Sequence, residues 1–595
     1  MDNIKTNDVK EKNYSKITKK LFSYILVEWK WFLLAIVLVI SSNLLVLWGP
    51  KYSGAAIDTL TKSKIDFNET YKNVYMMLFA YLGSSILTYI STRVMIRVSE
   101  KVILKMRQDT FEKIVDVPIK YIDTHQAGDL VSRISYDLEL VNRTMSDNIV
   151  SIVASVISVI GSFSMMMSIS PLLSLIFLVI LPVIIIFTRY RIKKTRPLFS
   201  IRSKKLGEMN GYVEEILNGQ KTIQAYEKEE HFSNEFWIRN SESIDAYYKA
   251  DYQASINFPT MGFITNVSIA LVSIFGALLY LDGVFSLGFL SAFILYARQF
   301  SFPINQIAGV VAEVQSALSA ANRVFVLLEQ DNEKHDAKDA IELKKVEGKV
   351  EFKNVSFGYD DQKMIIKDFN YVAEPGSLTA IVGQTGAGKT TLINLLMRFY
   401  DPQVGDILID DISYKKIKRK SQRGAFAMVL QDTWLFKGTI KENITYGMPN
   451  ASMEEIKKAA KSAHIDNFIE IQKDGYDTIL DEEAENLSQG QKQLMTIARA
   501  MLLNHPMLIL DEATSNVDSR TEIQIQDAMN KLMNGKTSFV IAHRLSTIQN
   551  ADNILLLSNG EVIEQGNHEE LITKKGEYYN LYTSQFIKAE KNKEM

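Results

Sequence analysis

The sequence predicts a membrane all-α domain with six helices, followed by an α/β domain built around a phosphate-binding loop. Apolar runs long enough to cross a bilayer all lie before residue 312. After that point short β-type runs alternate with helical patterns, which is typical of α/β domains. The stretch Leu378–Leu395 reads LTAIVGQTGAGKTTLINL and fits the pattern G-x-x-x-x-G-K-[ST].

Composition limits the classes of protein to consider. At 595 residues the chain is too long for one domain. A net charge of −2 gives no indication of a nucleic-acid partner. The absence of cysteine excludes disulfides, thiolate metal sites and a cysteine nucleophile. Met1–Lys20 is polar and Lys-rich, so we expect no cleavable signal peptide.

Residues 1–30 are expected to be a cytoplasmic segment in which Tyr14–Trp29 forms an amphipathic helix along the inner membrane interface. The alternative is that this helix is the start of the first span. The six predicted spans share a length of about 20 apolar residues. They are Trp31–Pro50, Val74–Val98, Ile149–Ser168, Leu172–Thr188, Phe258–Leu281 and Leu287–Val311.

The connections between the spans indicate the topology. Lys and Arg crowd the N-terminus and the long connections Ser99–Asn148 and Arg189–Asn257, whereas the short loops at Ser170–Pro171 and Asp282–Gly283 have none. The positive-inside rule therefore places the N-terminus, both long connections and the C-terminal half on the cytoplasmic side of the cell membrane. A polar connection at Pro50–Asn73 is expected outside.

One arginine lies inside the sixth span. An ionisable group there is costly unless it faces a cavity or a partner. For Arg298 a structural ion pair or helix–helix hydrogen bond is favoured over contact with a transported substrate. Domain boundaries follow from composition: 31–330 is the membrane domain, 331–346 a charged linker, 347–586 the nucleotide-binding domain and 587–595 a charged tail.

The phosphate-binding loop lies between an apolar strand and a helix. Its glycines allow a tight backbone turn, and its N–H groups and the helix N-terminus attract phosphate. Lys389 is expected to reach the β- and γ-phosphates, and the Thr390 hydroxyl to ligate Mg²⁺. Tyr359, after the first strand, is a weaker candidate for stacking on a nucleotide base.

A second motif, Met507–Glu512, reads MLILDE. Asp511 ends an apolar strand and is placed to hold Mg²⁺, while Glu512 is a candidate general base; the alternative is a buried strand that ends in a helix cap. Asn486–Gln493, NLSQGQKQ, opens a helix that offers a further anion-binding end. His543 is a candidate contact for the γ-phosphate, although a lone histidine is usually structural.

The order of these motifs resembles that of ATP-binding cassette (ABC) ATPases. Gln431 in VLQDTWLF matches the glutamine loop, Ser488–Gln491 an LSxGQ signature, Ser515–Asp518 the following loop and His543 the switch histidine. The membrane half resembles the six-span domain of ABC exporters. Three segments are similar to the two coupling segments and the junction of that family: Tyr121–Asp137, Glu214–Tyr226 and Gln315–Glu329.

The resemblance implies a half-transporter that must dimerise, because each ATP lies between the phosphate loop of one cassette and the signature of the other. It also implies a role for each matching residue. ATP would be held by Tyr359, Gly383, Gln384, Thr385, Gly386, Ala387, Gly388, Lys389, Thr390, Thr391 and Gln431. Mg²⁺ would be arranged by Thr390, Gln431 and Asp511, and hydrolysis carried by Glu512, His543 and Lys389. The partner's ATP would be served by Ser488, Gln489, Gly490 and Gln491, with Asp518 in the following loop.

The signature departs from the family's usual LSGGQ, because Gln489 replaces a glycine. Upstream, Thr478–Glu482 reads TILDE where TEVGE is usual. This pattern resembles the catalytic subunit of heterodimeric exporters, whose partner has a standard signature but lacks the catalytic glutamate. The hypothesis is therefore a heterodimer with such a subunit, and the alternative is a homodimer.

The resemblance implies ATP-driven export of amphipathic or hydrophobic compounds, such as drugs, lipids or peptides, by a dimer embedded in membrane lipid. The alternative is an ATP-gated or regulatory membrane subunit, against which Glu512 argues. The membrane spans exclude a soluble cassette ATPase that acts on nucleic acid or ribosomes. Abundant Lys, Ile and Asn favour an AT-rich bacterial source.

Overall fold

The computed structural model describes residues 14–62, 65–360, 363–430, 433–481, 484, 486–511, 517–542 and 545–584. The chain divides into two compact units. The first comprises Met1–Asp116 and His125–Gln330, and the second Val117–Thr124 and Asp331–Met595. The short segment Val117–Thr124 therefore belongs with the C-terminal unit, although the sequence around it belongs with the membrane helices.

The first unit is all-helical. Its long helices are α1 (Tyr14–Ile25), α2 (Trp29–Thr61), α3 (Phe67–Asp116), α7 (Ile149–Ile169), α8 (Pro171–Ala225), α9 (Glu229–Ser255), α10 (Asn257–Leu281) and α11 (Leu287–Leu328). Short elements η1 (Leu26–Glu28), α5 (Ala127–Ser132), η2 (Arg133–Asp137), α6 (Leu138–Arg143) and η3 (Thr144–Asn148) join them. Within the described part, six helical segments are long and apolar enough to cross a membrane, which confirms the six-span prediction.

The connection between the first two spans differs from the prediction. Helix α2 continues through the buried Pro50 to Thr61, where a polar loop was expected to begin. Close packing explains the continuation. A Cβ at Gly54 would lie 2.5 Å from the carbonyl oxygen of Gly288 in α11, so the two helices approach too closely for any side chain. Tertiary contact between small residues thus maintains a helix that contains a proline.

The two short connections, between spans three and four and between spans five and six, agree with the prediction. The Ser170 hydroxyl accepts a hydrogen bond from the Leu173 N–H at 3.2 Å and caps the start of α8. Asp282 and Gly283 follow α10, and Gly283 has a φ of 72°, which favours glycine.

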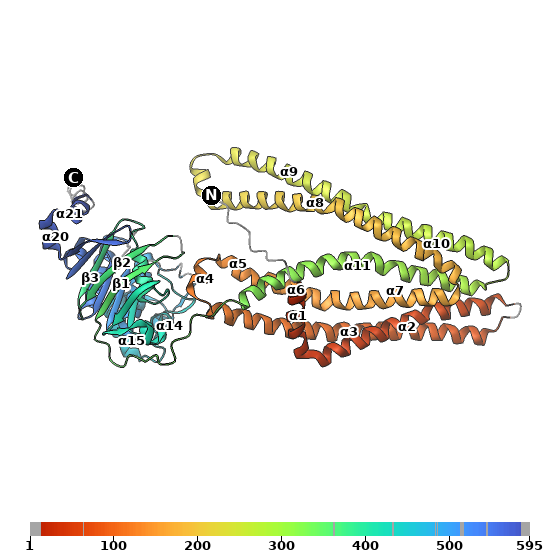
Figure 1. The fold of residues 1–595 in the computed structure, drawn as a ribbon, viewed down its shortest axis with the longest axis horizontal. Helices are drawn as coiled ribbons and strands as arrows, with labels where there is room; N and C mark the ends of the chain where they lie inside the picture. Colours follow the sequence, from red (N-terminus) through yellow and green to blue (C-terminus); the bar gives the residue numbers. More distant parts are fainter. Residues whose placement is uncertain are drawn as a thin grey trace. The chain divides into compact units, whose positions relative to one another are not determined.

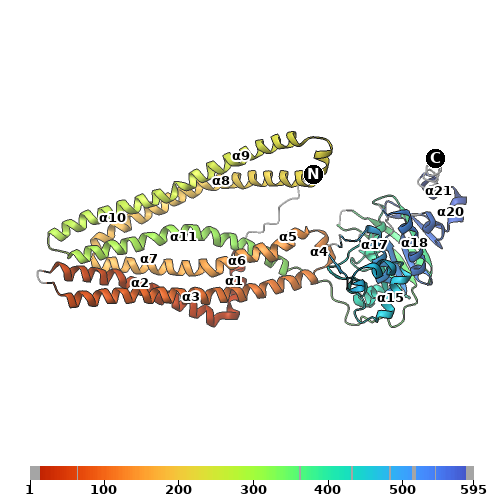
Figure 2. The same cartoon turned by 180° about the vertical axis from the view of Figure 1, so that it is seen from behind.

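Helices α2, α3, α7 and α11 lie together, and α8, α9 and α10 form a second group (Figure 1). The view from behind shows the same arrangement (Figure 2). One apolar core joins α1, α3, α6 and α11, and another joins α2, α7, α8, α10 and α11. Helices α8 and α9 extend as a pair, and apolar side chains near their connection are exposed: Leu217, Tyr226, Trp237 and Ile238.

The second unit is α/β, as predicted. A six-stranded sheet has the order β12-β11-β3-β10-β9-β6, and a four-stranded sheet has the order β2-β1-β4-β5. The first contains β3 (Leu378–Gly383), β6 (Phe426–Val429), β9 (Met507–Asp511), β10 (Thr537–Ile541), β11 (Asn553–Ser558) and β12 (Glu561–Gly566). The second contains β1 (Val350–Phe357), β2 (Ile366–Ala373), β4 (Val404–Ile409) and β5 (Ile412–Ser413).

Strand register decides where the functional residues meet. Strand β10 is parallel to both β3 and β9, and Ile541 pairs with Ile381 and with Asp511. The carboxyl ends of these three strands therefore share one edge, where ligands of open α/β sheets bind. The helices of this unit include α4 (Ile119–Asp123), α12 (Lys389–Leu396), α15 (Met453–Ser462), α17 (Gln489–Leu503) and α18 (Ser519–Met533).

The charged segment after Gln330, expected to be a linker, is held against the cassette by its carboxylates. Asp336 accepts a hydrogen bond from the Arg419 N–H at 3.0 Å, and Glu333 accepts one from Arg423 Nη1 at 3.1 Å. The charged side chains of this segment therefore hold it against the nucleotide-binding domain as well as keeping it soluble.

Candidate functional site: a nucleotide site at the sheet edge

The phosphate loop connects β3 to α12, as predicted. Gly386 and Gly388 have φ angles of 83° and 105°, which place both in the left-handed region. Gly388 caps helix α12, whose first residue is Lys389. The side chains of Gln384, Thr385 and Thr390 are exposed, whereas Ala387 and Thr391 are buried. Helix α12 therefore begins directly at the left-handed turn of the loop.

The ammonium group of Lys389 folds back on this loop. Its Nζ atom donates to the carbonyl oxygens of Gly383, at 2.8 Å, and Gln384, at 3.1 Å. Burial lowers the pKa of Lys389, while the nearby Asp511 carboxylate acts in the opposite direction. Among the described residues the hydrogen-bond acceptors of this partly buried cation are neutral carbonyls, which suits it to an anionic ligand, because a phosphate would replace weak partners with a charged one.

Asp511 ends β9 beside this loop, and residues Met507–Leu510 before it are fully buried. The position agrees with its predicted role in a Mg²⁺ site, in which Thr390 supplies a hydroxyl. A hydroxyl and a carboxylate fit the oxygen preference of Mg²⁺. Three other predicted residues, Gln431, Glu512 and His543, lie outside the described residues, and their roles stay predictions.

Tyr359 is anchored to the phosphate-loop helix through its hydroxyl. The Tyr359 Oη atom lies 3.3 Å from Thr391 Oγ1 and accepts a hydrogen bond from Asn394 Nδ2 at 3.1 Å. Its ring is 38% exposed, so one part remains open to solvent next to the loop. That arrangement is compatible with stacking on a base.

The signature residues begin a different helix. Ser488 caps α17 in a reciprocal box, in which the Ser488 N–H donates to Gln491 Oε1 at 2.8 Å and the Gln491 N–H to Ser488 Oγ at 3.3 Å. Gly490 is buried, and a Cβ there would lie 2.4 Å from Thr521 Cγ2. The exposed Gln489 donates from Nε2 to Thr433 Oγ1 at 3.4 Å, next to the glutamine loop.

The neighbouring loop is also capped. Asp518 accepts hydrogen bonds from the N–H groups of Arg520, at 3.1 Å, and Thr521, at 3.0 Å, and so caps α18. No hydrogen bond within the described cassette joins the signature to the phosphate loop. The phosphate loop begins α12 and the signature begins α17, so the two parts of the predicted site start different helices.

The prediction that Arg298 makes a structural ion pair or helix–helix hydrogen bond stays a prediction. The arginine is exposed on α11, and it makes no ion pair or hydrogen bond with any other residue that the structure describes. Its neighbours Tyr296 and Ala297 are fully buried on the opposite face, against α2, α7 and α8. The side chain therefore points away from the apolar core that these helices form.

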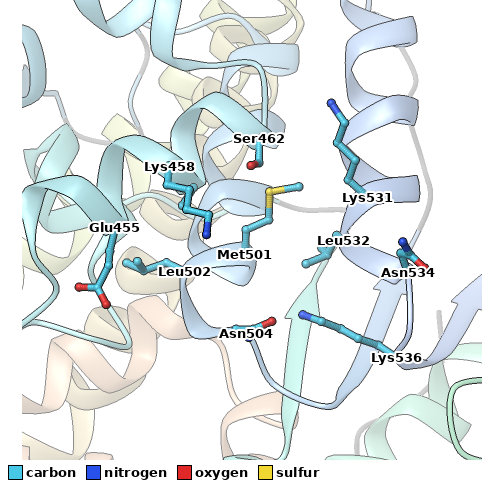
Figure 3. Close-up of a pocket in the computed structure, with 11 residues that line it drawn as sticks. Glu455, Lys458, Ser462, Met501, Leu502, Asn504, Lys531, Leu532, Asn534 and Lys536 are labelled. Carbon is cyan, nitrogen blue, oxygen red and sulfur yellow. The ribbon is translucent and has the colours of Figure 1, made fainter.

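A separate cavity of about 420 Å³ lies among α15, α17 and α18 (Figure 3). Lysines 458, 531 and 536 line it, and Lys536 directly precedes β10. It therefore lies at the amino end of that strand, whereas the phosphate loop follows the carboxyl end of β3. None of the predicted site residues lines this cavity.

Sequence reasoning missed Tyr400. Its hydroxyl donates to Asp123 Oδ2 at 2.5 Å across 277 residues of sequence, and its ring packs against Tyr359. Nothing local distinguishes this tyrosine, since its contacts come from distant parts of the chain. The only available signal was that Asp123 falls in the segment similar to a coupling segment.

Family models match both units. Residues 32–304 match the ABC transporter transmembrane region, and residues 366–515 match the ABC transporter ATPase family. The chain is 40% identical over 579 residues to the ABC transporter ATP-binding protein YfiC of Bacillus subtilis (strain 168), covering 97% of this chain and 96% of that one.

Two further relatives have names that state a cargo. The fatty acid ABC transporter ATP-binding/permease protein of Mycobacterium bovis is 40% identical, over 87% of this chain and 82% of its own length. The lipid A-core flippase of Hahella chejuensis is 34% identical, over 97% and 98%. Among solved structures, a bacterial Atm1-family ABC exporter with ATP bound aligns with a TM-score of 0.77 and 27% identity, over 93% of this chain and 97% of that one.

Proposed function

This chain belongs to the ABC transporter family as a multi-pass membrane protein that couples ATP hydrolysis to transport, and we propose that it exports amphipathic compounds with an anionic headgroup. The observation that carries the proposal is the combination of a phosphate-loop site with Arg298, an exposed arginine in the sixth membrane helix that makes no ion pair or hydrogen bond with another described residue. The first supplies the driving energy, and the second selects the cargo.

We place ATP hydrolysis at the edge of the six-stranded sheet where β3, β9 and β10 end. The backbone of Gly386–Lys389 and the ammonium group of Lys389 bind the β- and γ-phosphates, Tyr359 stacks on the adenine, and Thr390, Gln431 and Asp511 hold Mg²⁺. Mg²⁺ would supply charge neutralisation at the phosphates. Glu512 takes a proton from the attacking water, and His543 contacts the γ-phosphate.

A dimer completes the site. The signature at Ser488–Gln491 and the loop at Asp518 serve ATP held by a partner, as the resemblance to ABC exporters implies, and they start helices other than the one that follows their own phosphate loop. The exposed apolar tip of the α8–α9 pair supports this arrangement. Its first half overlaps Glu214–Tyr226, the segment similar to a coupling segment of ABC exporters, so we propose that the tip docks on the partner's cassette. Gln489 in the signature favours a partner with a standard signature, and thus a heterodimer.

The cargo class follows from Arg298. It lies 11 residues after Leu287, the first residue of α11, which corresponds to roughly 16 Å along the helix. That depth is near the middle of a hydrocarbon core of about 30 Å. An arginine exposed to lipid there is costly, so it faces the cavity between subunits. A carboxylate or phosphate headgroup would satisfy it, and two relatives are named for fatty acid and lipid A-core cargo.

The test uses the chain reconstituted in lipid vesicles, alone and together with its genomic neighbour. A fluorescent fatty acid and its uncharged methyl ester are the probes. We expect ATP-dependent movement of the acid, abolished by Glu512→Gln and reduced at least fivefold by Arg298→Gln, while movement of the ester is unchanged in Arg298→Gln.

The outcomes separate the parts of the proposal. ATP hydrolysis that survives Glu512→Gln would refute the assigned base. Hydrolysis without movement of either probe would indicate a gated or regulatory subunit. Equal loss of both probes in Arg298→Gln would refute the headgroup contact. If the chain alone transports the acid as fast as the pair does, the functional unit is a homodimer and not a heterodimer.

A further inference from the structure

An unbroken series of contacts leads from the phosphate loop to the segment Val117–Thr124. Helix α12 begins at the loop, and Tyr400 follows its C-terminal end. The rings of Tyr359 and Tyr400 meet edge to face, with centroids 5.0 Å apart and an interplanar angle of 88°. The Tyr400 hydroxyl then donates to Asp123 Oδ2 at 2.5 Å. All of these residues belong to the second compact unit.

The middle of this series is rigidly held. Tyr400 is 8% exposed and also packs against the ring of Phe357, with centroids 5.5 Å apart. Phe357 in turn contacts Tyr359, with centroids 5.2 Å apart, so the three aromatic rings pack around one another. Phe357 and Tyr400 are buried and Tyr359 packs on both, so a displacement of the Tyr359 ring is transmitted to its buried neighbours.

The polar end of the series is a single charge-assisted hydrogen bond. Burial raises the pKa of Tyr400, and the hydrogen bond to Asp123 raises it further, so the hydroxyl stays protonated and remains the donor. Asp123 is the last residue of α4, and the chain leaves the cassette unit directly after Thr124. The bond therefore ties the cassette at the point where the chain returns to the membrane helices.

We propose that Tyr400 is a positioning residue that links occupancy of the base-binding Tyr359 to the membrane helices through its hydrogen bond to Asp123. A base that stacks on Tyr359 shifts its ring, the packed ring of Tyr400 follows, and α4 moves with it. The inference rests on the proposed stacking role of Tyr359. It adds a base-sensing connection that is separate from the phosphate contacts.

The absence of cysteine makes a direct test practical, because one introduced cysteine can be labelled alone. Asp282→Cys, in the exposed turn after α10, would carry an environment-sensitive dye in the full-length protein in lipid nanodiscs. The dye response to ATP and Mg²⁺ reports the membrane unit. Titration with a trinitrophenyl ATP analogue reports nucleotide affinity separately.

We expect Tyr400→Phe to leave the Kd of the analogue within twofold and to reduce the dye response at least threefold. Asp123→Ala should behave in the same way, and the double variant should lose no more than either single variant, because both remove one bond. Asp123→Asn keeps an acceptor oxygen and should restore most of the response.

The matched control is Tyr476→Phe. Tyr476 also donates to an aspartate, Asp466 Oδ1, at 2.5 Å within the cassette, and it is similarly buried. We expect its dye response to equal that of the parent. A normal response in Tyr400→Phe, or an equal loss in Tyr400→Phe and Tyr476→Phe, would overturn the proposal. Unchanged analogue affinity in Tyr359→Ala would instead refute the stacking role on which it rests.

Discussion

Three glycines of the phosphate loop should respond differently to alanine, and the structure ranks them. A Cβ at Gly386 meets nothing within 4 Å, whereas a Cβ at Gly388 would lie 2.7 Å from Ile366 Cδ1. At Gly383 it would lie 2.4 Å from the backbone oxygen of Leu557 in β11. All three have positive φ angles, 83°, 105° and 152° in that order, so each alanine adds backbone strain.

These contacts set how much each alanine substitution lowers the free energy of unfolding. Strain in the left-handed region costs about 1 kcal/mol at Gly386. At Gly383 the backbone of β11 cannot yield cheaply, so overpacking adds about 1–3 kcal/mol. Gly388 should fall between, because the end of a flexible isoleucine can move. For a domain of this size, each kcal/mol lowers the Tm by roughly 2–4 °C.

The ATP affinities of the three alanine variants should follow a different order from their thermal stabilities. The open space above Gly386 is where we place the phosphates, so the Gly386→Ala methyl group should weaken ATP binding at least tenfold while the Tm falls least. Differential scanning fluorimetry and titration with a fluorescent ATP analogue on the full-length protein measure both quantities. ATP affinity within twofold of the parent in a folded Gly386→Ala variant would refute the placement of the phosphates.

Two further predictions concern an ion pair and the signature. Asp137→Asn should lower the free energy of unfolding by about 2–3 kcal/mol, because Asp137 is 1% exposed and bonded to two nitrogens of the half-exposed Arg323. Thermal unfolding in detergent measures this loss of stability. The control is Asp245→Asn, which breaks an exposed ion pair with Lys249 and should change the free energy of unfolding little. An equal loss of stability in the two variants would contradict the argument. Gln489→Gly should raise the ATPase rate of the chain alone severalfold by opening the signature. The control is Thr433→Val, which removes the hydrogen bond to Gln489 but keeps the glutamine, and it should not raise the ATPase rate. A similar rise in both variants would mean that the hydrogen bond, and not the size of Gln489, limits the rate.

Local sequence determined much of the fold and part of the site. Apolar runs of spanning length require helices, because lipid offers no partner to backbone polar groups. The strand–loop–helix at Leu378–Leu395 needs its glycines for positive φ angles, so its motif predicted the observed backbone. The capped start of α17 likewise follows from Ser488 and Gln491, three residues apart.

Tertiary structure decided the features that depend on distant neighbours. Helix α2 passes through Pro50 because Gly54 packs on Gly288, a contact that no local pattern encodes. For Arg298 the cost of a charge in lipid predicts an ion pair or a helix–helix hydrogen bond, whereas the direction of its side chain depends on which face of α11 the other helices cover. Tyr400 acquired its role from Asp123, 277 residues earlier. Residue type and spacing specify local backbone and chemistry, whereas only the packed chain determines which distant groups touch.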